Sequence, residues 1–348
     1  MAVDPARFDE VAAQIHKKYA NIIRSGDDYQ HPPRISTRSL ALDVAMGGGI
    51  PVGRISRFYG NYSSTKTLNS WNIIAEAQKM GMTCCYWNIE KAYDKKFVEY
   101  FAGVDTKALK IAEVSGIEEV GDALEALLSV AHLHVIDSCS AAVSDDEVNA
   151  DINEWRPGIA ARAWGKAMRR INKQFDQGEN VIVMIDQVRV NFKTGSEDAA
   201  GGKILDHASS MSVKFKKHGW LYKNKEGWLD PKAKQTKSVM NDQTEPDGME
   251  IKARVEKSRV GRPLIPATMR LDFETKQFDR TYELVEAAKA YEVVENRGGG
   301  NYYYPAVPQK GKKQQRLYGE AALREFVEEN KMLQKTIRNK AIQAAASR

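Results

Sequence analysis

The sequence predicts a mixed α/β protein whose core is a mostly parallel β-sheet with antiparallel strands added at one edge. Between residues 55 and 185, short apolar strand-like runs alternate with helical runs, which is typical of βαβ units. Residues 54–80 read as a strand, a tight turn and a helix. After Gly202, strand-like runs at 211–215, 250–257 and 267–273 follow one another without such helices, so we expect antiparallel edge strands there.

Length and composition restrict the class of protein. The chain has 348 residues, of which 42% are hydrophobic and 28% are charged, enough for one large core and one or two smaller modules. No apolar run approaches the roughly 18–20 residues that a membrane span needs, and the N-terminus lacks a signal-peptide pattern. We therefore expect a soluble, cytoplasmic protein without a membrane partner. Its three cysteines lie in apolar runs, which predicts buried free thiols.

The turn from Gly60 to Thr67 has the spacing of a phosphate-binding loop, G-x-x-x-x-G-K-[ST], except that Thr65 replaces the second glycine. In such loops, backbone N–H groups at a helix N-terminus converge on an anion. The lysine, here Lys66, reaches the β- and γ-phosphates, and the hydroxyl of Thr67 would hold Mg²⁺. Taken alone, a degenerate loop is a weak indication, and an ordinary turn before a helix explains it as well.

Three polar residues follow predicted strands. Asp137 ends the apolar run 133–137, where a carboxylate can hold Mg²⁺ through water, although it could simply cap the next segment. Glu90 follows the run 83–89 and could orient an attacking water, or pair with Lys91 on the surface. Gln187 follows the run 180–185 and could sense the γ-phosphate and relay it to the polar loop behind it.

The two ends of the chain predict smaller elements. Residues 5–24 have helical periodicity and lead into an extended linker, so this helix must dock on the core or on a neighbouring subunit. Residues 283–335 contain two helical patterns around a Gly- and Tyr-rich turn, which indicates a small α/β domain. We therefore divide the chain into an N-terminal helix and linker (1–33), a core (34–275) and a C-terminal domain (276–348).

Several short motifs lie around the phosphate loop in a distinctive order. They are Ile35-Ser36-Thr37 with Ser39-Leu40 and Leu42-Asp43, Gly47 to Ile55, Glu90 with Asp94, Gly103-Val104-Asp105, Val135 to Ser138, Gly158 to Arg162, Ala167-Met168-Arg169, Gln187-Val188-Arg189 and Gly201-Gly202. In this order of motifs, the chain resembles the bacterial RecA recombinase family and its phage relatives over roughly residues 8–335.

This resemblance implies a RecA-type P-loop NTPase core that binds ATP and Mg²⁺. Glu90 would be the catalytic carboxylate, Gln187 the γ-phosphate switch, and Thr67 and Asp137 the metal-side residues. Lys257 and Arg259 would reach the nucleotide of a neighbouring subunit, comparable to arginine fingers. The implied nucleotide contacts are Gly60, Asn61, Tyr62, Ser63, Ser64, Thr65, Lys66, Thr67, Leu68 and, at the adenine, Asp94.

The resemblance also implies DNA partners. Two loops, at about 149–158 and 189–202, would line a filament axis and grip DNA. The implied DNA-binding residues are Trp155, Arg156, Arg162, Arg169, Arg189, Phe192, Lys193, Gly201 and Gly202. Cations with an apolar wedge suit backbone neutralisation and base-step separation. The expected function is ATP-dependent strand exchange between single-stranded and duplex DNA by a helical homo-oligomer, in homologous recombination and repair.

The sequence departs from the family at several positions. Thr65 places a β-branched residue where glycine is usual, which predicts about 1–3 kcal/mol of strain. Asp186 stands where the family usually has Asn, and would repel a triphosphate unless a metal or cation intervenes. His207 replaces an aromatic residue of the subunit interface, and Lys91 replaces a His.

The C-terminus is basic where bacterial members are acidic. The run 309–316 and the segment 331–348 suggest a DNA-steering surface and a phage-encoded member, although ordinary solvated charge is an equal alternative. Two other functions stay open: a DNA-binding filament with weak or no ATP turnover, and a ring-forming helicase motor.

Overall fold

The computed structural model describes residues 5–18, 23, 26–28, 32–151, 158–175, 179–190, 197–224, 227–229, 245–307 and 314–347. The chain divides into two compact units, residues 1–33 and 34–348, which are described separately. The first unit contains helix α1 (Pro5–Lys18) and a 3₁₀ turn (Gly26–Asp28). The predicted helix over 5–24 is confirmed as far as Lys18, and most of the remainder lies outside the described residues.

One large sheet organises the second unit, with strand order β13–β12–β9–β3–β7–β6–β4–β5 and with β8 paired to β7. The strands are β3 (Ile55–Gly60), β4 (Cys84–Asn88), β5 (Lys110–Ala112), β6 (Leu133–Asp137), β7 (Val181–Val190), β8 (Glu197–Ala199), β9 (Met211–Leu221), β12 (Gly248–Ser258) and β13 (Pro266–Asp272). Neighbours from β9 to β5 pair in parallel, whereas β12 and β13 are antiparallel. The predicted α/β fold with a mostly parallel sheet and antiparallel edge strands is confirmed.

The direction of the strand at 211–215 was predicted wrongly. It was expected to be antiparallel, but β9 runs parallel to its core neighbour β3, with Ser56 opposite Met211. The reason is helix α8 (Gly202–Ala208), which carries the chain back across the sheet before β9 begins. Only its other neighbour, β12, is antiparallel to β9.

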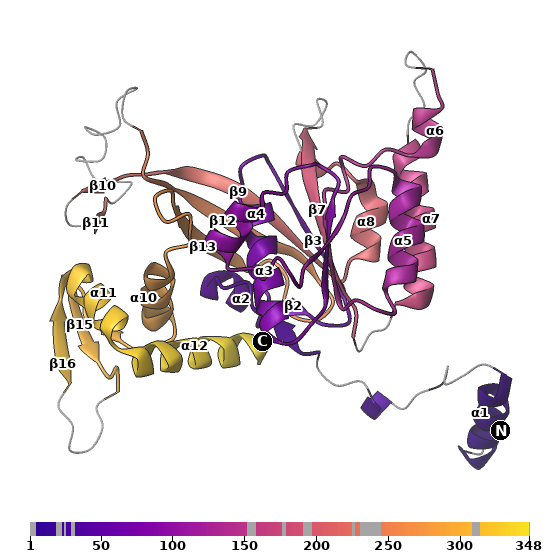
Figure 1. The fold of residues 1–348 in the computed structure, drawn as a ribbon. Helices are drawn as coiled ribbons and strands as arrows, with labels where there is room; N and C mark the ends of the chain where they lie inside the picture. Colours follow the sequence, from indigo (N-terminus) through magenta and orange to yellow (C-terminus); the bar gives the residue numbers. More distant parts are fainter. Residues whose placement is uncertain are drawn as a thin grey trace. The chain divides into compact units, whose positions relative to one another are not determined.

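Helices cover both faces of the sheet (Figure 1). On one side lie α3 (Lys66–Lys79), α4 (Lys95–Phe97) and a π-helical turn (Val98–Ala102), and on the other α5 (Ile117–Leu127), α7 (Ile159–Gln174) and α8. Along β7, residues 181, 183 and 185 enter one core and residues 182 and 184 enter the other. This explains the uninterrupted apolar runs, because both faces of a parallel sheet are buried. The cysteines are free and buried, as predicted.

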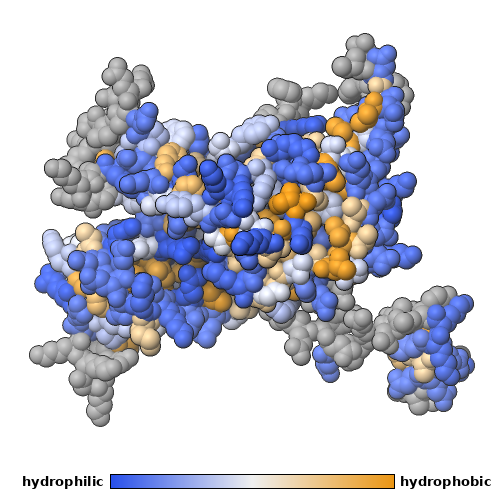
Figure 2. All heavy atoms as spheres, in the orientation of Figure 1, coloured by the Kyte–Doolittle hydropathy of each residue, from blue (hydrophilic) through white to orange (hydrophobic). Residues whose placement is uncertain are grey.

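Short elements connect these layers. They are β1 (Arg34–Ile35), α2 (Leu40–Ala45), β2 (Ile50–Pro51), α6 (Asp145–Val148), β10 (Lys223–Asn224) and β11 (Gly227–Trp228). Hydrophilic residues cover most of the described face of the second unit that Figure 2 shows. Within the described part of the chain, no helix has both the length and the hydropathy that crossing a bilayer requires.

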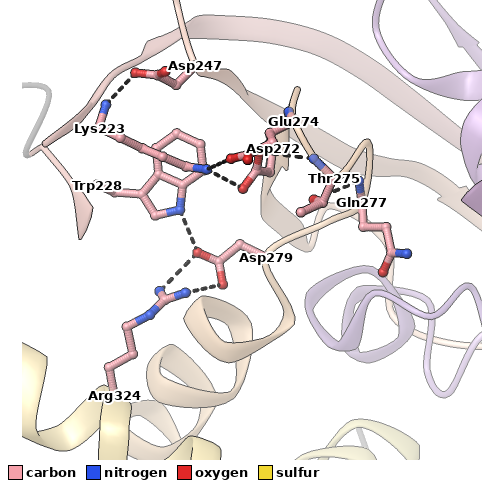
Figure 3. A network of polar contacts seen from close by, with 9 residues as sticks. All are labelled: Lys223, Trp228, Asp247, Asp272, Glu274, Thr275, Gln277, Asp279 and Arg324. Carbon is pink, nitrogen blue, oxygen red and sulfur yellow. Dashed lines mark hydrogen bonds and ion pairs between the residues drawn. The ribbon is translucent and has the colours of Figure 1, made fainter. Parts of the chain in front are cut away.

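The C-terminal part forms the predicted small α/β module. It consists of α10 (Arg280–Ala290), a three-stranded antiparallel sheet of β14 (Glu295–Asn296), β15 (Asn301–Tyr304) and β16 (Gln315–Tyr318), and helices α11 (Gly319–Glu329) and α12 (Lys331–Ala346). Asp279 joins this module to the β10–β11 hairpin (Figure 3): the Trp228 indole N–H donates to Oδ2 at 2.8 Å, and Arg324 donates to both carboxylate oxygens at 2.8 and 2.9 Å. The same carboxylate caps α10 by accepting the Tyr282 N–H at 3.0 Å.

Candidate functional site

The phosphate loop lies between β3, near the centre of the sheet, and α3. A Cβ on Gly60 would lie 2.0 Å from the carbonyl oxygen of Phe215, so the loop can begin only with glycine. The Lys66 ammonium is buried and donates to the carbonyls of Gly60 at 2.9 Å and Asn61 at 2.8 Å. Burial lowers the pKa of Lys66, while the carboxylates of Asp137, Glu90 and Asp186 raise it. The loop therefore wraps around a cation held close to several carboxylates.

Thr65 occupies the left-handed conformation that glycine would take, with φ 66° and ψ 17°. Its hydroxyl donates to the Ser64 carbonyl at 2.6 Å. The Asn69 side-chain amide donates to the Thr65 carbonyl at 2.9 Å and to its hydroxyl at 3.3 Å. The loop thus keeps a glycine-like backbone despite the β-branched side chain, and a buried residue one turn into α3 holds it there.

Hard oxygen donors meet beside the loop. The Thr67 hydroxyl donates to Asp137 Oδ2 at 2.8 Å, and the Tyr86 hydroxyl donates to the same oxygen at 2.8 Å. Burial raises the pKa of Asp137, whereas these two hydrogen bonds lower it. A hydroxyl and a carboxylate next to a phosphate loop suit Mg²⁺, which keeps several waters and takes few protein ligands. The residues present therefore fit the metal that the sequence predicts.

The proposed catalytic carboxylate and switch residue are in contact. The Gln187 side-chain amide donates to Glu90 Oε1 at 3.1 Å, and the Ser138 hydroxyl donates to the same oxygen. Lys91 instead pairs with Glu113, at 2.8 Å. Because β4, β6 and β7 are parallel neighbours, their carboxyl ends bring these side chains to one edge of the sheet.

Two residues at this edge, Tyr86 and Ser138, were missed from the sequence. Tyr86 lies in the middle of a buried strand and looks like a core residue. Ser138 directly follows Asp137, so its position after a strand was the one signal available. Neither could be assigned without the pairing of β4 with β6.

Asp94 lies at a surface hollow on the α3 side of the sheet. Its carboxylate caps α4 by accepting the Phe97 N–H at 2.9 Å. The hollow has a volume of about 680 Å³ and is lined by Asp94, aromatic rings including Phe97 and Phe101, and Lys276. Flat rings next to a carboxylate are suited to a heteroaromatic base.

Lys257 and Arg259 lie together at the end of β12 and contact helix α8. The Lys257 ammonium donates to the Asp206 carbonyl, and the Arg259 guanidinium donates to the His207 carbonyl at 3.2 Å. Cations are favourable at the carbonyl end of a helix. The described hydrogen bonds of their side chains are to α8, and none is to the phosphate loop of the same chain.

In the segment predicted to be the second DNA loop, the described residues form the base of a β-hairpin, in which β7 pairs with β8. Arg189 is exposed on β7 and pairs in register with β8, and Gly201 and Gly202 lead into α8. Arg162 and Arg169 are exposed on α7. Four other predicted DNA contacts, Trp155, Arg156, Phe192 and Lys193, lie outside the described residues.

A basic stripe on β9 and β12 was also missed from the sequence. Lys216 lies opposite Lys252 and Lys214 lies opposite Arg254 in the register of these strands. Like charges directly opposite each other destabilise a sheet, and Glu197 offsets part of this repulsion by pairing with Lys214 at 3.1 Å. The signal was two basic residues at alternate positions of each strand, but only the pairing of the strands brings the charges together.

A family model described as the RecA N-terminal domain matches residues 7–247, more than half of the chain. The matched segment begins in α1 and extends to the start of β12. It therefore contains the phosphate loop and the ends of β4, β6 and β7.

Proposed function

The chain belongs to the RecA family, and we propose that it is an ATP-dependent DNA strand-exchange recombinase that forms helical filaments on single-stranded DNA. The observation that carries this proposal is the meeting of Gln187 with Glu90 beside the Thr67–Asp137 pair. A base, a switch residue and a metal-side pair at one sheet edge are the parts that ATP hydrolysis coupled to DNA binding requires.

At the nucleotide, Lys66 and the loop N–H groups would bind the phosphates, and the hollow at Asp94 would take the base. Thr67 and Asp137 would hold Mg²⁺, which neutralises developing phosphate charge when bound. Glu90 would orient the attacking water. Gln187, which now donates to Glu90, would instead donate to the γ-phosphate and so report its presence to the β7–β8 hairpin.

Between subunits, Lys257 and Arg259 would leave the α8 carbonyls and reach the nucleotide of the next protomer, and α1 would pack on that protomer. This arrangement places ATP at a junction, so that hydrolysis and filament state are coupled. Each transferred cation would stabilise negative charge that develops in the transition state.

On DNA, the two loops and Arg162, Arg169 and Arg189 would bind the first strand, and the basic stripe on β9 and β12 would bind a second DNA segment. The α12 cations and the 309–316 run would steer duplex DNA toward the filament. These charges support a phage-encoded member acting in the cytoplasm of a bacterial or phage-infected cell. The division into segments 1–33, 34–275 and 276–348 is part of this proposal.

The test is Glu90→Gln, assayed by phosphate release with single-stranded DNA. We expect turnover to fall about 10²–10⁴-fold, the range for a lost general base, with ATP binding retained. Glu113→Gln is the matched control, because Glu113 pairs with Lys91 on the surface, and it should change turnover less than about twofold. Unchanged turnover in Glu90→Gln would overturn the assignment.

A DNA-binding filament with little turnover is the second candidate, because Thr65 is held in a strained left-handed conformation. Phosphate release by the native chain on single-stranded DNA decides between these two. Imaging with a non-hydrolysable ATP analogue should show helical filaments, whereas closed rings would indicate a helicase motor.

A further inference from the structure

We propose that the buried Arg57–Asp186 ion pair is a positioning device that fixes the base of the β7–β8 hairpin and sets how strongly DNA changes ATP turnover. The inference rests on the proposed function and adds two residues to it. The experiment below separates the failure of this inference from the failure of that function.

The pair lies between two neighbouring strands of the core. Arg57 on β3 is 2% exposed and Asp186 on β7 is fully buried, and the Arg57 guanidinium contacts Asp186 Oδ2 directly. Isolated charges are strongly disfavoured in a protein interior, and they persist where they are paired and hydrogen-bonded. A buried ion pair in this position therefore fixes the backbone groups that are hydrogen-bonded to it.

Both members of the pair are bonded to the residues that close the hairpin. Asp186 Oδ2 accepts the Gly201 N–H at 2.9 Å, and an Arg57 N–H donates to the Gly202 carbonyl at 3.3 Å. The Ala200 N–H donates to the Gln187 carbonyl at 2.7 Å beside them. The chain that returns from the hairpin is thus held against β7 at successive residues.

The fit around Gly201 is tight. A Cβ there would lie 2.4 Å from Leu205 Cδ1, 2.5 Å from Asp186 Oδ2 and 3.3 Å from the Arg57 guanidinium. The close approach of Leu205 and of the two charged groups to this backbone explains why glycine is needed before α8. A residue with a side chain would require Leu205 and the ion pair to move away from the hairpin base.

The Arg57–Asp186 pair is also connected to the predicted nucleotide site through both of its residues. Arg57 precedes Gly60 by three residues on β3. The other Asp186 oxygen, Oδ1, accepts the N–H of Gln187 at 2.9 Å, and Gln187 contacts Glu90. A shift of the hairpin base on DNA binding would therefore move the backbone of the switch residue, and loss of the pair would weaken that relay.

The first measurement is the ratio of ATP turnover with and without saturating single-stranded DNA. Asp186→Asn keeps an acceptor for Gly201 but leaves the guanidinium unpaired, and Arg57→Met leaves the carboxylate unpaired. We expect each to lower the ratio at least about fivefold. The double variant should lose far less than the product of the two, as expected for residues in direct contact.

Two further variants guard against a general loss of stability. Arg57→Lys keeps the charge but cannot reach both Asp186 and the Gly202 carbonyl, so it should fold and still lower the ratio. Glu76→Gln breaks the half-buried pair between Glu76 on α3 and Arg38 before α2 and should leave the ratio unchanged. Independent, multiplicative effects of Arg57→Met and Asp186→Asn would overturn the inference.

Hydrogen exchange of the protein without nucleotide or DNA gives a readout that needs no activity. In Asp186→Asn and Arg57→Lys, amides of residues 197–202 should exchange at least about tenfold faster, with α5 unchanged. Unchanged exchange in both variants would overturn the anchoring role even if ATP turnover responds to DNA. Faster exchange in a chain that lacks DNA-stimulated turnover would support the anchor and overturn the proposed function instead.

Discussion

Thr65 in the phosphate loop and Asp186 at the hairpin base would each be unfavourable without support, and the residues that support them lie at different distances along the sequence. In the loop, the left-handed Thr65 is held by Ser64 and Asn69, within four residues. At the hairpin base, Asp186 is held by Arg57, which is 129 positions away. One departure is a problem of backbone conformation and the other is a problem of charge.

The difference follows from the energies involved. A left-handed non-glycine residue costs about 1–3 kcal/mol, which neighbouring hydrogen bonds can partly offset. An unpaired buried charge costs about 3–5 kcal/mol, so it needs a full partner. The expected repulsion between Asp186 and a triphosphate is thereby reduced, because Arg57 supplies the intervening cation.

Gly60→Ala should prevent the phosphate loop from adopting its conformation, and we expect it to cause the largest loss of stability of the variants considered. Its Cβ would lie 2.0 Å from a backbone carbonyl, so the free energy of unfolding should fall by about 4 kcal/mol or more, a size reached only by severe steric change. Urea denaturation measures it. Gly81→Ala is the matched control, because it has φ +80° with open space around it and should lose only about 1–2 kcal/mol. Equal losses of stability in the two variants would mean that the positive φ, and not the steric contact with the Phe215 carbonyl, determines the cost of the Gly60 substitution.

These regions also show what the sequence could predict. The strands, the loop spacing and the polar strand ends follow from patterns within a few residues, and the structure places Glu90, Asp137 and Gln187 at one edge as expected. The seven-residue helix α8 was too short to recognise from the sequence. The predicted direction of β9 relative to β3 was therefore wrong. The Arg57–Asp186 ion pair could not be predicted from the sequence, because the order of the strands in the sheet decides which residues of β3 and β7 face each other.

Glu283 extends the comparison with Asp186, because it is also a buried carboxylate. Its hydrogen-bond donors are a hydroxyl and backbone amides, and its charged neighbour is another carboxylate. It is 3% exposed and accepts from the Ser39 hydroxyl at 2.8 Å, and burial, with Asp43 nearby, raises its pKa to about 8. Unfolded, this group titrates near 4.5. Between about pH 4.5 and pH 8, the folded state therefore holds a proton on Glu283 that the unfolded state has lost. The contribution of this group to the free energy of unfolding is fully present below about pH 4.5 and is lost as the pH rises to about 8.

Glu283→Gln should remove that loss. We expect the native chain to lose about 2 kcal/mol of unfolding free energy between pH 6 and 8, within the limit of about 1.4 kcal/mol per pH unit for one proton. The variant should show a flatter profile in urea melts at pH 6, 7 and 8. Glu286→Gln, on the exposed side of the same helix, is the control and should keep the native slope. A native profile that is flat over this range would contradict a neutral Glu283.

Thr65→Gly is the smallest effect and tests the local side of the comparison. Glycine relieves the left-handed strain but loses the hydroxyl contacts to Ser64 and Asn69 and gains unfolded-state entropy, so the net gain in stability should be about 1 kcal/mol. Calorimetry should show ATP affinity rising by up to about fivefold, the equivalent of that energy. Glu292→Gly, at another left-handed position with φ 51°, should give a similar stability gain with unchanged ATP affinity. Weaker ATP binding in Thr65→Gly would instead assign the threonine hydroxyl a direct role at the phosphates, and the residue would then be a ligand rather than a tolerated departure.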